Sequence, residues 1–238
     1  MGAVTGRGSQ GVRGAARRLA AAGVVRETWV LARREGPVAL ARAATHRYII
    51  DSHSFFLYEH RHGSRPDAGL CACPSGFEEF FVEENASADR LSEGRCDFRD
   101  AVPGARRALD SGAVAFCLYN GREVAHVGWL ATSLRGRRAL DRLGYEVRFD
   151  RGEGWTGAAF TMPRFRNRGL LAYSCLRRFE FLCDAGIAVS RAAVATDNAS
   201  SHHVTMRFEP RVYAIGRQLR ILTWRRWTER PVTAVDLV

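Results

Sequence analysis

The sequence of 238 residues contains no lysine, because all 36 of its basic residues are arginine. With its many alanines, this composition indicates a GC-rich genome rather than a function. No apolar run approaches the roughly 20 residues that a membrane span requires, and the apolar run at 19–25 is too short and badly flanked for a secretory signal. The sequence therefore predicts a cytoplasmic protein without a transmembrane segment.

The six cysteines form no C-x-x-C motif and no regular framework, which predicts reduced thiols rather than disulfides. His60 with His62, and Cys71 with Cys73, pair metal-ligating residue types on an extended segment. Neither pair has the spacing of a common zinc module. We therefore expect incidental histidine and cysteine on a strand end and a returning strand, and no metal.

Positive charge concentrates near the N-terminus, where residues 1–47 hold nine arginines against Glu27 and Glu35, or +7 of the net +11. We expect 1–46 to be a basic N-terminal extension, disordered at first and then helical, and 47–238 to be the main domain. Aromatic residues do not interleave with the basic run, so a nucleic-acid partner is not expected.

The stretch 155–186 is the element around which the chain is organised. Residues 155–162 are small and apolar, as in a strand, and from Ala172 onward apolar residues recur at helical spacing until Gly186, where a glycine commonly follows a helix. A glycine at Gly169, in the first turn of that helix, allows an anion to approach unpaired backbone amides. The stretch predicts a phosphate site, or else an ordinary strand–helix connection whose arginines face solvent.

Strand-like runs outnumber helices around this unit, which indicates the α+β class. Asn120-Gly121 between two β-rich runs predicts a hairpin with a type I′ turn, which needs positive φ at both positions. A basic loop is expected before 145. Other strands are expected at 55–58, 145–149, 154–162, 187–196, 211–215 and 219–227, and short helices at 102–109 and 200–208.

The run Arg166-Asn167-Arg168-Gly169-Leu170-Leu171 resembles the R-x-x-G-x-G/A pyrophosphate loop of the GNAT superfamily of CoA-dependent N-acyltransferases. Asp197-Asn198 resembles the family's asparagine after the fifth strand, and the match covers 113–227. The sequence departs from the pattern in two respects. Leu171 replaces a small residue, and Thr205 stands where many members carry a tyrosine, with Glu209-Pro210 where they carry Gly-Phe.

The resemblance implies a GNAT-like fold, a central mixed, mostly antiparallel sheet flanked by helices, with acetyl-CoA or another acyl-CoA as co-substrate. It implies cofactor contacts from the strand end, the loop, the first helical turn and the later asparagine: Phe160, Thr161, Met162, Arg166, Asn167, Arg168, Gly169, Leu170, Leu171, Ala172 and Asn198. A backbone amide near Thr161 would stabilise the oxyanion.

The implied activity is direct transfer of an acyl group, most simply acetyl, to a primary amine of a small molecule. The base must lie within hydrogen-bond reach of the amine, directly or through water, and the strand-borne candidates are His126, Glu123 and Glu146. Thr205, His202, His203 or water would protonate the leaving thiolate, or the step needs no acid. A noncatalytic acyl-CoA-binding or sensor protein of the same fold is the alternative, and a dimer is compatible with either.

Overall fold

The computed structural model of the protein describes residues 50–62, 72–233 and 236. The chain divides into two compact units, one of 53–218 with 226–238 and the other of 1–52 with 219–225. Of the second unit the structure describes short pieces of three strands, where Arg220 pairs with Asp51. The expected extension over 1–46 lies outside the described residues.

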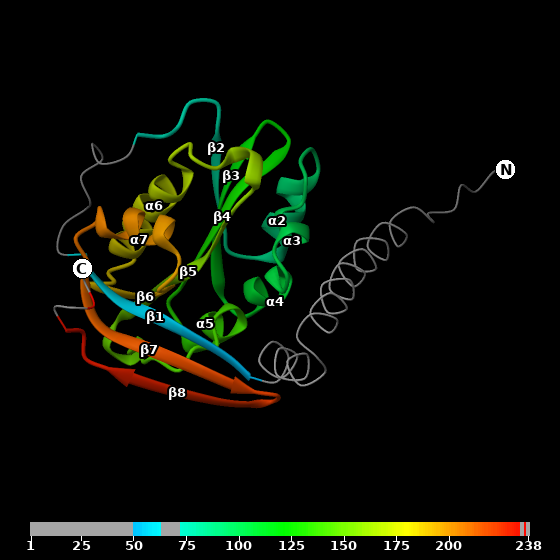
Figure 1. Ribbon diagram of the computed structural model, residues 1–238. Coiled ribbons are helices and arrows are strands. Elements are labelled where there is room, and N and C mark those ends of the chain that lie inside the picture. Colours follow the sequence, from blue (N-terminus) through cyan, green and yellow to red (C-terminus); the bar gives the residue numbers. More distant parts are fainter. Residues whose placement is uncertain (1–49, 63–71, 234–235, 237–238) are drawn as a thin grey trace, which may run out of the picture. The chain divides into compact units, whose positions relative to one another are not determined.

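The described residues form an eight-stranded sheet in the order β2-β3-β4-β5-β6-β1-β7-β8 (Figure 1). Neighbours pair antiparallel from β2 to β5 and at β1 with β6, whereas β5 and β6 are parallel. The strands are β1 Ile50–Arg61, β2 Glu78–Val82, β3 Ala113–Asn120, β4 Glu123–Ala131, β5 Glu153–Thr161, β6 Val189–Ala195, β7 Arg211–Ile221 and β8 Trp224–Arg230. The expected mixed, mostly antiparallel α+β fold is confirmed.

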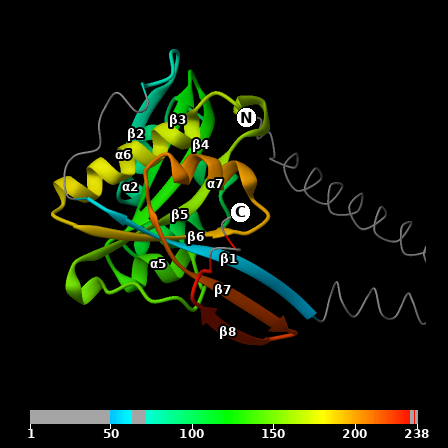
Figure 2. The same ribbon diagram turned by 60° about the vertical axis from the view of Figure 1, so that its left-hand side comes forward.

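Helices cover both faces of the sheet. α6 and α7 lie on one face, and α2, α3, α4 and α5 on the other (Figures 1 and 2). The helices are α2 Asn85–Ser92, α3 Phe98–Ala101, α4 Ala105–Asp110, α5 Leu134–Leu140, α6 Leu170–Asp184 and α7 Ala199–Met206, with 3-10 turns at Phe149–Arg151 and Pro163–Phe165. Within the described segments, no helix is long and apolar enough to cross a membrane.

The strand β3 is buried on both faces, so it reads as an almost continuous apolar run rather than an alternating one. Its odd-numbered residues, such as Ala115 and Cys117, join the cluster beneath α2 to α5. Its even-numbered residues, such as Phe116 and Leu118, join the cluster beneath α6. Because successive side chains point to opposite faces, one strand supplies both layers of the core.

The hairpin between β3 and β4 is present, but the expected turn type is wrong. Asn120 pairs with Glu123, so the two-residue loop is Gly121-Arg122 rather than Asn120-Gly121. Gly121 has φ +58°, whereas neither Asn120 nor Arg122 has positive φ. A positive φ at the first loop position alone is the pattern of a type II′ turn, which fits the strand twist equally well.

Two other expectations before β5 are wrong. The region expected to be a loop contains α5, whose N-terminus is capped because the Ser133 side chain accepts a hydrogen bond from the Gly136 amide. The expected strand at 145–149 is absent from the structure: residues 145–148 have no regular secondary structure, and a 3-10 turn begins at Phe149. Arg137 of α5 donates to the carbonyls of Tyr145 and Leu143, so these carbonyls bond to a side chain instead of a neighbouring strand.

The strand–turn–helix unit expected at 155–186 is confirmed as β5 followed by α6. The helix ends in a Schellman motif, in which the amides of Gly186 and Ile187 bond to the carbonyls of Cys183 and Leu182. Gly186 has φ +75°, the left-handed conformation that glycine adopts without strain.

The strands β5 and β6 diverge after a short parallel contact. They pair at three positions, from Glu153 with Val189 to Trp155 with Arg191. Arg191 stabilises this closed end, since its guanidinium lies 2.7 Å from a Glu153 carboxylate oxygen. Beyond Trp155, β5 bends at a bulge where Ala158 has φ +46°. Among the described residues, the edge of β5 that faces β6 therefore has no strand partner over its second half, and a wedge opens between the two strands.

Candidate functional site

An elongated depression runs from the N-terminus of α6 into the wedge between β5 and β6. Its wide part, which we call the outer groove, has a volume of about 930 Å³ and lies between the end of β5 and the first turns of α6 and α7. The narrower part, which we call the inner cavity, has a volume of about 240 Å³. Both are lined by Ala159, Leu171, Asn198 and Ser201, so they adjoin each other.

The outer groove gathers most of the predicted cofactor contacts. Nine of the eleven predicted residues line it: Phe160, Thr161, Arg166, Asn167, Gly169, Leu170, Leu171, Ala172 and Asn198. The remaining two, Met162 and Arg168, do not line it. Met162 packs against the core beneath α6, and the guanidinium of Arg168 lies 5.6 Å from the centre of the Phe165 ring.

The N-terminus of α6 has the properties of an anion site. Gly169 is the N-cap residue with φ +76°, one position before the first helical turn in which we expected it. No side chain caps this end, and the first amide that bonds back within the helix is that of Tyr173, to the Gly169 carbonyl. The preceding amides of the first turn therefore remain available, and the helix dipole adds partial positive charge beside them.

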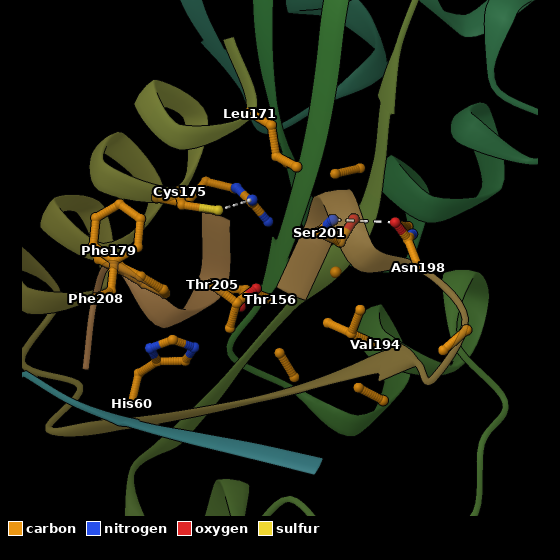
Figure 3. A pocket seen from close by; sticks show the side chains of 17 residues that line it. His60, Thr156, Leu171, Cys175, Phe179, Val194, Asn198, Ser201, Thr205 and Phe208 are labelled. Atoms are coloured by element: carbon orange, nitrogen blue, oxygen red, sulfur yellow. Dashed lines mark hydrogen bonds between the residues drawn. The ribbon is translucent and has the colours of Figure 1, made fainter. Parts of the chain in front are cut away.

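The inner cavity is formed by four elements that follow one another in the sequence, β5, α6, β6 and α7, and by β1, which is distant from them. It is lined by His60 of β1, Thr156 of β5, residues 192–195 of β6, Cys175 and Arg178 of α6, and Thr205 of α7, among others. Figure 3 shows the His60 ring pointing from β1 toward Thr156 and Thr205. The cavity is therefore enclosed on the strand side by β5, β6 and β1 and on the helix side by α6 and α7.

Arg178 is a buried cation in the wall of the inner cavity. Its residue is 3% exposed, and its guanidinium donates to the carbonyls of Ser174 and Trp129 and to the Cys175 sulfur, the last at 3.3 Å. The dashed line at Cys175 in Figure 3 marks this last bond. Within the described residues no carboxylate forms an ion pair with Arg178, so its charge is solvated by neutral groups alone.

His60 is 4% exposed, and its Nδ1 atom has no hydrogen-bond partner in the part of the chain that the structure describes. Burial, together with smaller contributions from the neighbouring His62 and Arg178, lowers the pKa of His60 to about 3. The imidazole is therefore neutral at pH 7. A neutral ring presents one donor and one acceptor to its surroundings.

The three predicted bases do not line either part of the depression. His126 is fully buried in β4, where Nδ1 lies 2.7 Å from the Thr161 hydroxyl, and burial lowers its pKa to about 3. Glu123 forms a 2.6 Å ion pair with Arg164. Glu146 is exposed and lies beside a separate depression bordered by α5. Of the three, His126 alone contacts a residue of the outer groove, through Thr161.

The groups proposed to protonate a leaving thiolate are separated by the structure. Thr205 lines the inner cavity and His203 the outer groove. His202 has both ring nitrogens engaged, because Tyr58 Oη lies 2.6 Å from Nδ1 and Nε2 donates to the Ala195 carbonyl. A ring held in this way has no free proton to give to a ligand.

Asn198 is the N-cap residue of α7. Its side-chain oxygen accepts a hydrogen bond from the Ser201 amide at 3.1 Å and so caps α7. Asn198 also lines both the outer groove and the inner cavity. The cap fixes its side-chain oxygen and leaves the amide nitrogen as a possible donor to a ligand.

The histidine and cysteine pairs considered for metal binding are not brought together in the described structure. His62 Nε2 lies 2.9 Å from the Ser190 hydroxyl, and Cys73 is exposed on the segment before β2. Cys71 lies outside the described residues. Among the residues that are described, no group of three or more histidine, cysteine or acidic side chains is arranged to hold a metal ion.

Sequence patterns did not identify Arg178 and His60 as neighbours in one cavity. A signal for Arg178 was present, since it lies three residues after Cys175 and one before Phe179, within the apolar stripe of α6. A charged residue in a buried stripe indicates a partner that the core must supply. No comparable signal exists for His60, whose neighbours are set by the pairing of β1 with β6.

No family profile matches the sequence, and no curated protein matches it at a significant level. Solved structures resemble its backbone. A GCN5-related N-acetyltransferase from Sphaerobacter thermophilus has 14% identity and a TM-score of 0.45, over 84% of this chain and 59% of its own. A Drosophila protein has 13% identity and a TM-score of 0.49, over 76% of this chain and 56% of its own.

A tandem GNAT protein from the clavulanic acid biosynthesis pathway has 14% identity and a TM-score of 0.44, over 83% of this chain and 60% of its own. The chain therefore spans somewhat more than half the length of each of these three structures. Two of the three are described as members of the superfamily that the loop at Arg166 resembles.

Proposed function

We propose that the protein is an acyl-CoA-dependent N-acyltransferase that transfers an acyl group to a primary amine of a small molecule. The observation that carries the proposal is the pair of adjoining depressions, of which one lies at the uncapped N-terminus of α6 and the other in the wedge between β5 and β6. One end suits a phosphate, and the other suits an extended chain that bonds to the free edge of a strand.

In this proposal the amides of the first turn of α6 bind the pyrophosphate of the cofactor. Arg166 and Asn167 add a charge and a donor at the same end. The unpaired edge of β5, from Thr156 to Thr161, bonds to the pantetheine arm and presents an amide to the thioester oxygen. The thioester then lies near the bulge at Ala158, where the outer groove meets the inner cavity.

The reaction needs no covalent enzyme intermediate. The neutral amine attacks the thioester carbonyl, the C–N bond forms, and the C–S bond breaks. One proton leaves the amine nitrogen and is returned to the CoA thiolate, so that CoA-SH and an amide are the products. The chain contributes mainly by orientation and by preorganised donors, which together lower the barrier without a nucleophilic side chain.

The proposal is tested by placing a side chain at Gly169. Because Gly169 has φ +76° and open space around it, a β-branched residue would strain the backbone, whereas asparagine tolerates this conformation. Gly169→Asn should raise the dissociation constant of CoA by about tenfold or more in calorimetry, since its side chain occupies the space of the ligand phosphate.

Gly104→Asn is the matched control, because Gly104 is also an N-cap glycine with φ +82° and open space, at the start of α4. It should leave CoA affinity unchanged and shift the melting temperature by about as much as Gly169→Asn does. If the parent protein binds no CoA at millimolar concentration, or if both variants bind it like the parent, the proposal is wrong.

A noncatalytic acyl-CoA sensor is the second candidate. One observation favours it: among the described residues that line the outer groove or the inner cavity there is no aspartate or glutamate. Release of free thiol from acetyl-CoA in the presence of a panel of amines distinguishes the two. An enzyme releases CoA with at least one amine, whereas a sensor binds acetyl-CoA and leaves it intact with all of them.

A further inference from the structure

The charge of Arg178 is not balanced in the described structure. Buried charges in proteins are normally paired, because removing a charge from water without a counter-charge is unfavourable. The three bonds of the guanidinium go to two backbone carbonyls and a sulfur, which solvate the charge without neutralising it. A guanidinium has five N–H donors, so two remain for a further acceptor.

The groups around Arg178 do not supply the missing charge. His60 and His126 both have their pKa lowered to about 3, chiefly by burial and in part by Arg178, and are neutral at pH 7. Nδ1 of His60, which lines the inner cavity, is buried without a hydrogen-bond partner in the described residues, as are Nε2 of His126 and the hydroxyl of Ser174, which do not line it. A buried cation with unsatisfied polar atoms near it is the environment of a ligand anion.

The packing around Arg178 also depends on a glycine in the facing strand. A Cβ atom on Gly128 of β4 would lie 2.6 Å from the Ser174 hydroxyl oxygen and 3.0 Å from Arg178 Nε. The absence of a side chain at Gly128 therefore gives the guanidinium its place between α6 and the sheet. This arrangement keeps the charge at the wall of the inner cavity rather than at the solvent-exposed surface.

We propose that the inner cavity binds a carboxylate through Arg178, and that this carboxylate is the free end of a dicarboxylic acyl group on CoA. The inference rests on the proposed function. A thioester that lies along the outer groove with its phosphates at α6 carries its acyl end inward, past Ala159 and Leu171, to the cavity that Arg178 lines. A carboxylate on the acceptor amine is the other source of the same chemistry.

The test compares the binding of three ligands to the intact protein by calorimetry: CoA, butyryl-CoA and succinyl-CoA. Butyryl-CoA has an acyl chain of similar length without the charge. Succinyl-CoA should bind about tenfold or more tightly than butyryl-CoA, because a desolvated Arg178 forms charge-assisted hydrogen bonds with its carboxylate. Equal affinities for the two thioesters would contradict an acyl carboxylate.

Arg178→Met removes the charge and keeps an unbranched chain in the same space. It should abolish the preference for succinyl-CoA and change the affinity for CoA itself by less than about twofold. Arg177→Met is the matched control on the same helix, because Arg177 pairs with Glu79 and Glu180 and does not line the cavity. If Arg178→Met does not fold, the comparison of thioesters on the parent protein decides the question.

A second experiment tests whether the carboxylate that Arg178 binds belongs to the acceptor amine. The ratio kcat/KM for acetyl transfer is measured with an α-amino acid and with its neutral amide. A preference for the acid that Arg178→Met removes, without any preference for succinyl-CoA, would overturn the acyl assignment in favour of the acceptor. If CoA binds but neither experiment discriminates, the carboxylate site is wrong while the proposed function stands. If CoA does not bind, both are wrong.

Discussion

The outer groove and the inner cavity belong to one depression, but the chain builds them differently. The outer groove is formed mainly by residues 159–172, a contiguous run in which a strand, a turn and a helix follow one another, with the start of α7 completing it. The inner cavity takes its walls from β1, β5, β6, α6 and α7. At the outer end charge is exposed and solvated, whereas at the inner end Arg178 is 3% exposed.

This difference has an energetic consequence. At the outer end, arginines beside solvent gain little from any one contact, and a ligand replaces water at modest cost. At the inner end, each buried polar group depends on its neighbours for solvation, so a single change alters several interactions at once. We therefore expect substitutions at the inner end to change stability as well as binding, and substitutions at the outer end to change chiefly binding.

The largest effect on stability should come from lowering the pH. Burial lowers the pKa of His60 to about 3 and that of His62 to about 4, so the unfolded chain takes up protons on these histidines from about pH 6.5 downward while the folded chain does not. Their contribution to stability is present above that pH and is lost as the pH falls. The free energy of unfolding should decrease by about 2 to 4 kcal/mol from these two groups between pH 7 and pH 5.

Urea unfolding at the two pH values measures this loss. His60→Gln should reduce the pH dependence, because one of the buried groups that resists protonation is gone. His203→Gln changes an exposed histidine of the outer groove and should leave the dependence as in the parent. An equal reduction in both variants would show that the two ends do not differ in this respect.

An intermediate effect is expected from Gly128→Ala. The added methyl group would contact Ser174 and Arg178 at less than ordinary van der Waals distance, and their displacement should cost about 1 to 3 kcal/mol of stability. Chemical denaturation measures the cost. Gly94→Ala is the control, because Gly94 has open space and no positive φ. A Gly128→Ala protein as stable as the parent would mean that the arginine is not confined by packing.

The smallest effect is expected at Asn198, where the two ends meet. Asn198→Ala should destabilise the protein by about 1 kcal/mol because α7 loses its N-cap, whereas Asn198→Asp should retain the cap and most of the stability. The aspartate nevertheless places a negative charge beside the proposed phosphate site. Calorimetry should therefore show weaker CoA binding for Asn198→Asp than for the parent, and equal binding would remove Asn198 from the cofactor contacts.

The contrast between the two ends also explains what the sequence could predict. The strand, the turn and α6 follow from local patterns, because the apolar stripe and the terminal glycines act over a few residues. Nine of the predicted contacts line the outer groove for the same reason. α5 was not predicted because it contains Gly136, which local propensity disfavours in a helix. A Cβ there would lie 3.0 Å from the Gly112 carbonyl oxygen, so close packing favours glycine.

The inner cavity could not be predicted in this way. His60 becomes a neighbour of Thr156 and Thr205 only through the strand order, in which β1 lies beside β6 instead of beside β2. The irregular segment before β5 was misread for a related reason. Arg137 donates hydrogen bonds to the carbonyls of Tyr145 and Leu143, and such a side-chain interaction cannot be recognised from the alternation of apolar residues.

The place of β1 in the sheet has a consequence for folding. Phe55 pairs with Ala195 and Arg61 with Val189. The partner strand β6 therefore lies more than a hundred residues after β1 in the sequence. Contacts of such sequence separation form slowly, since a long loop must close before they contribute. During synthesis, β2, β3 and β4 can pair as soon as they emerge, whereas β1 must remain unpaired until β6 has been made. The cavity that contains His60 and Arg178 is thus among the last parts of the molecule to form.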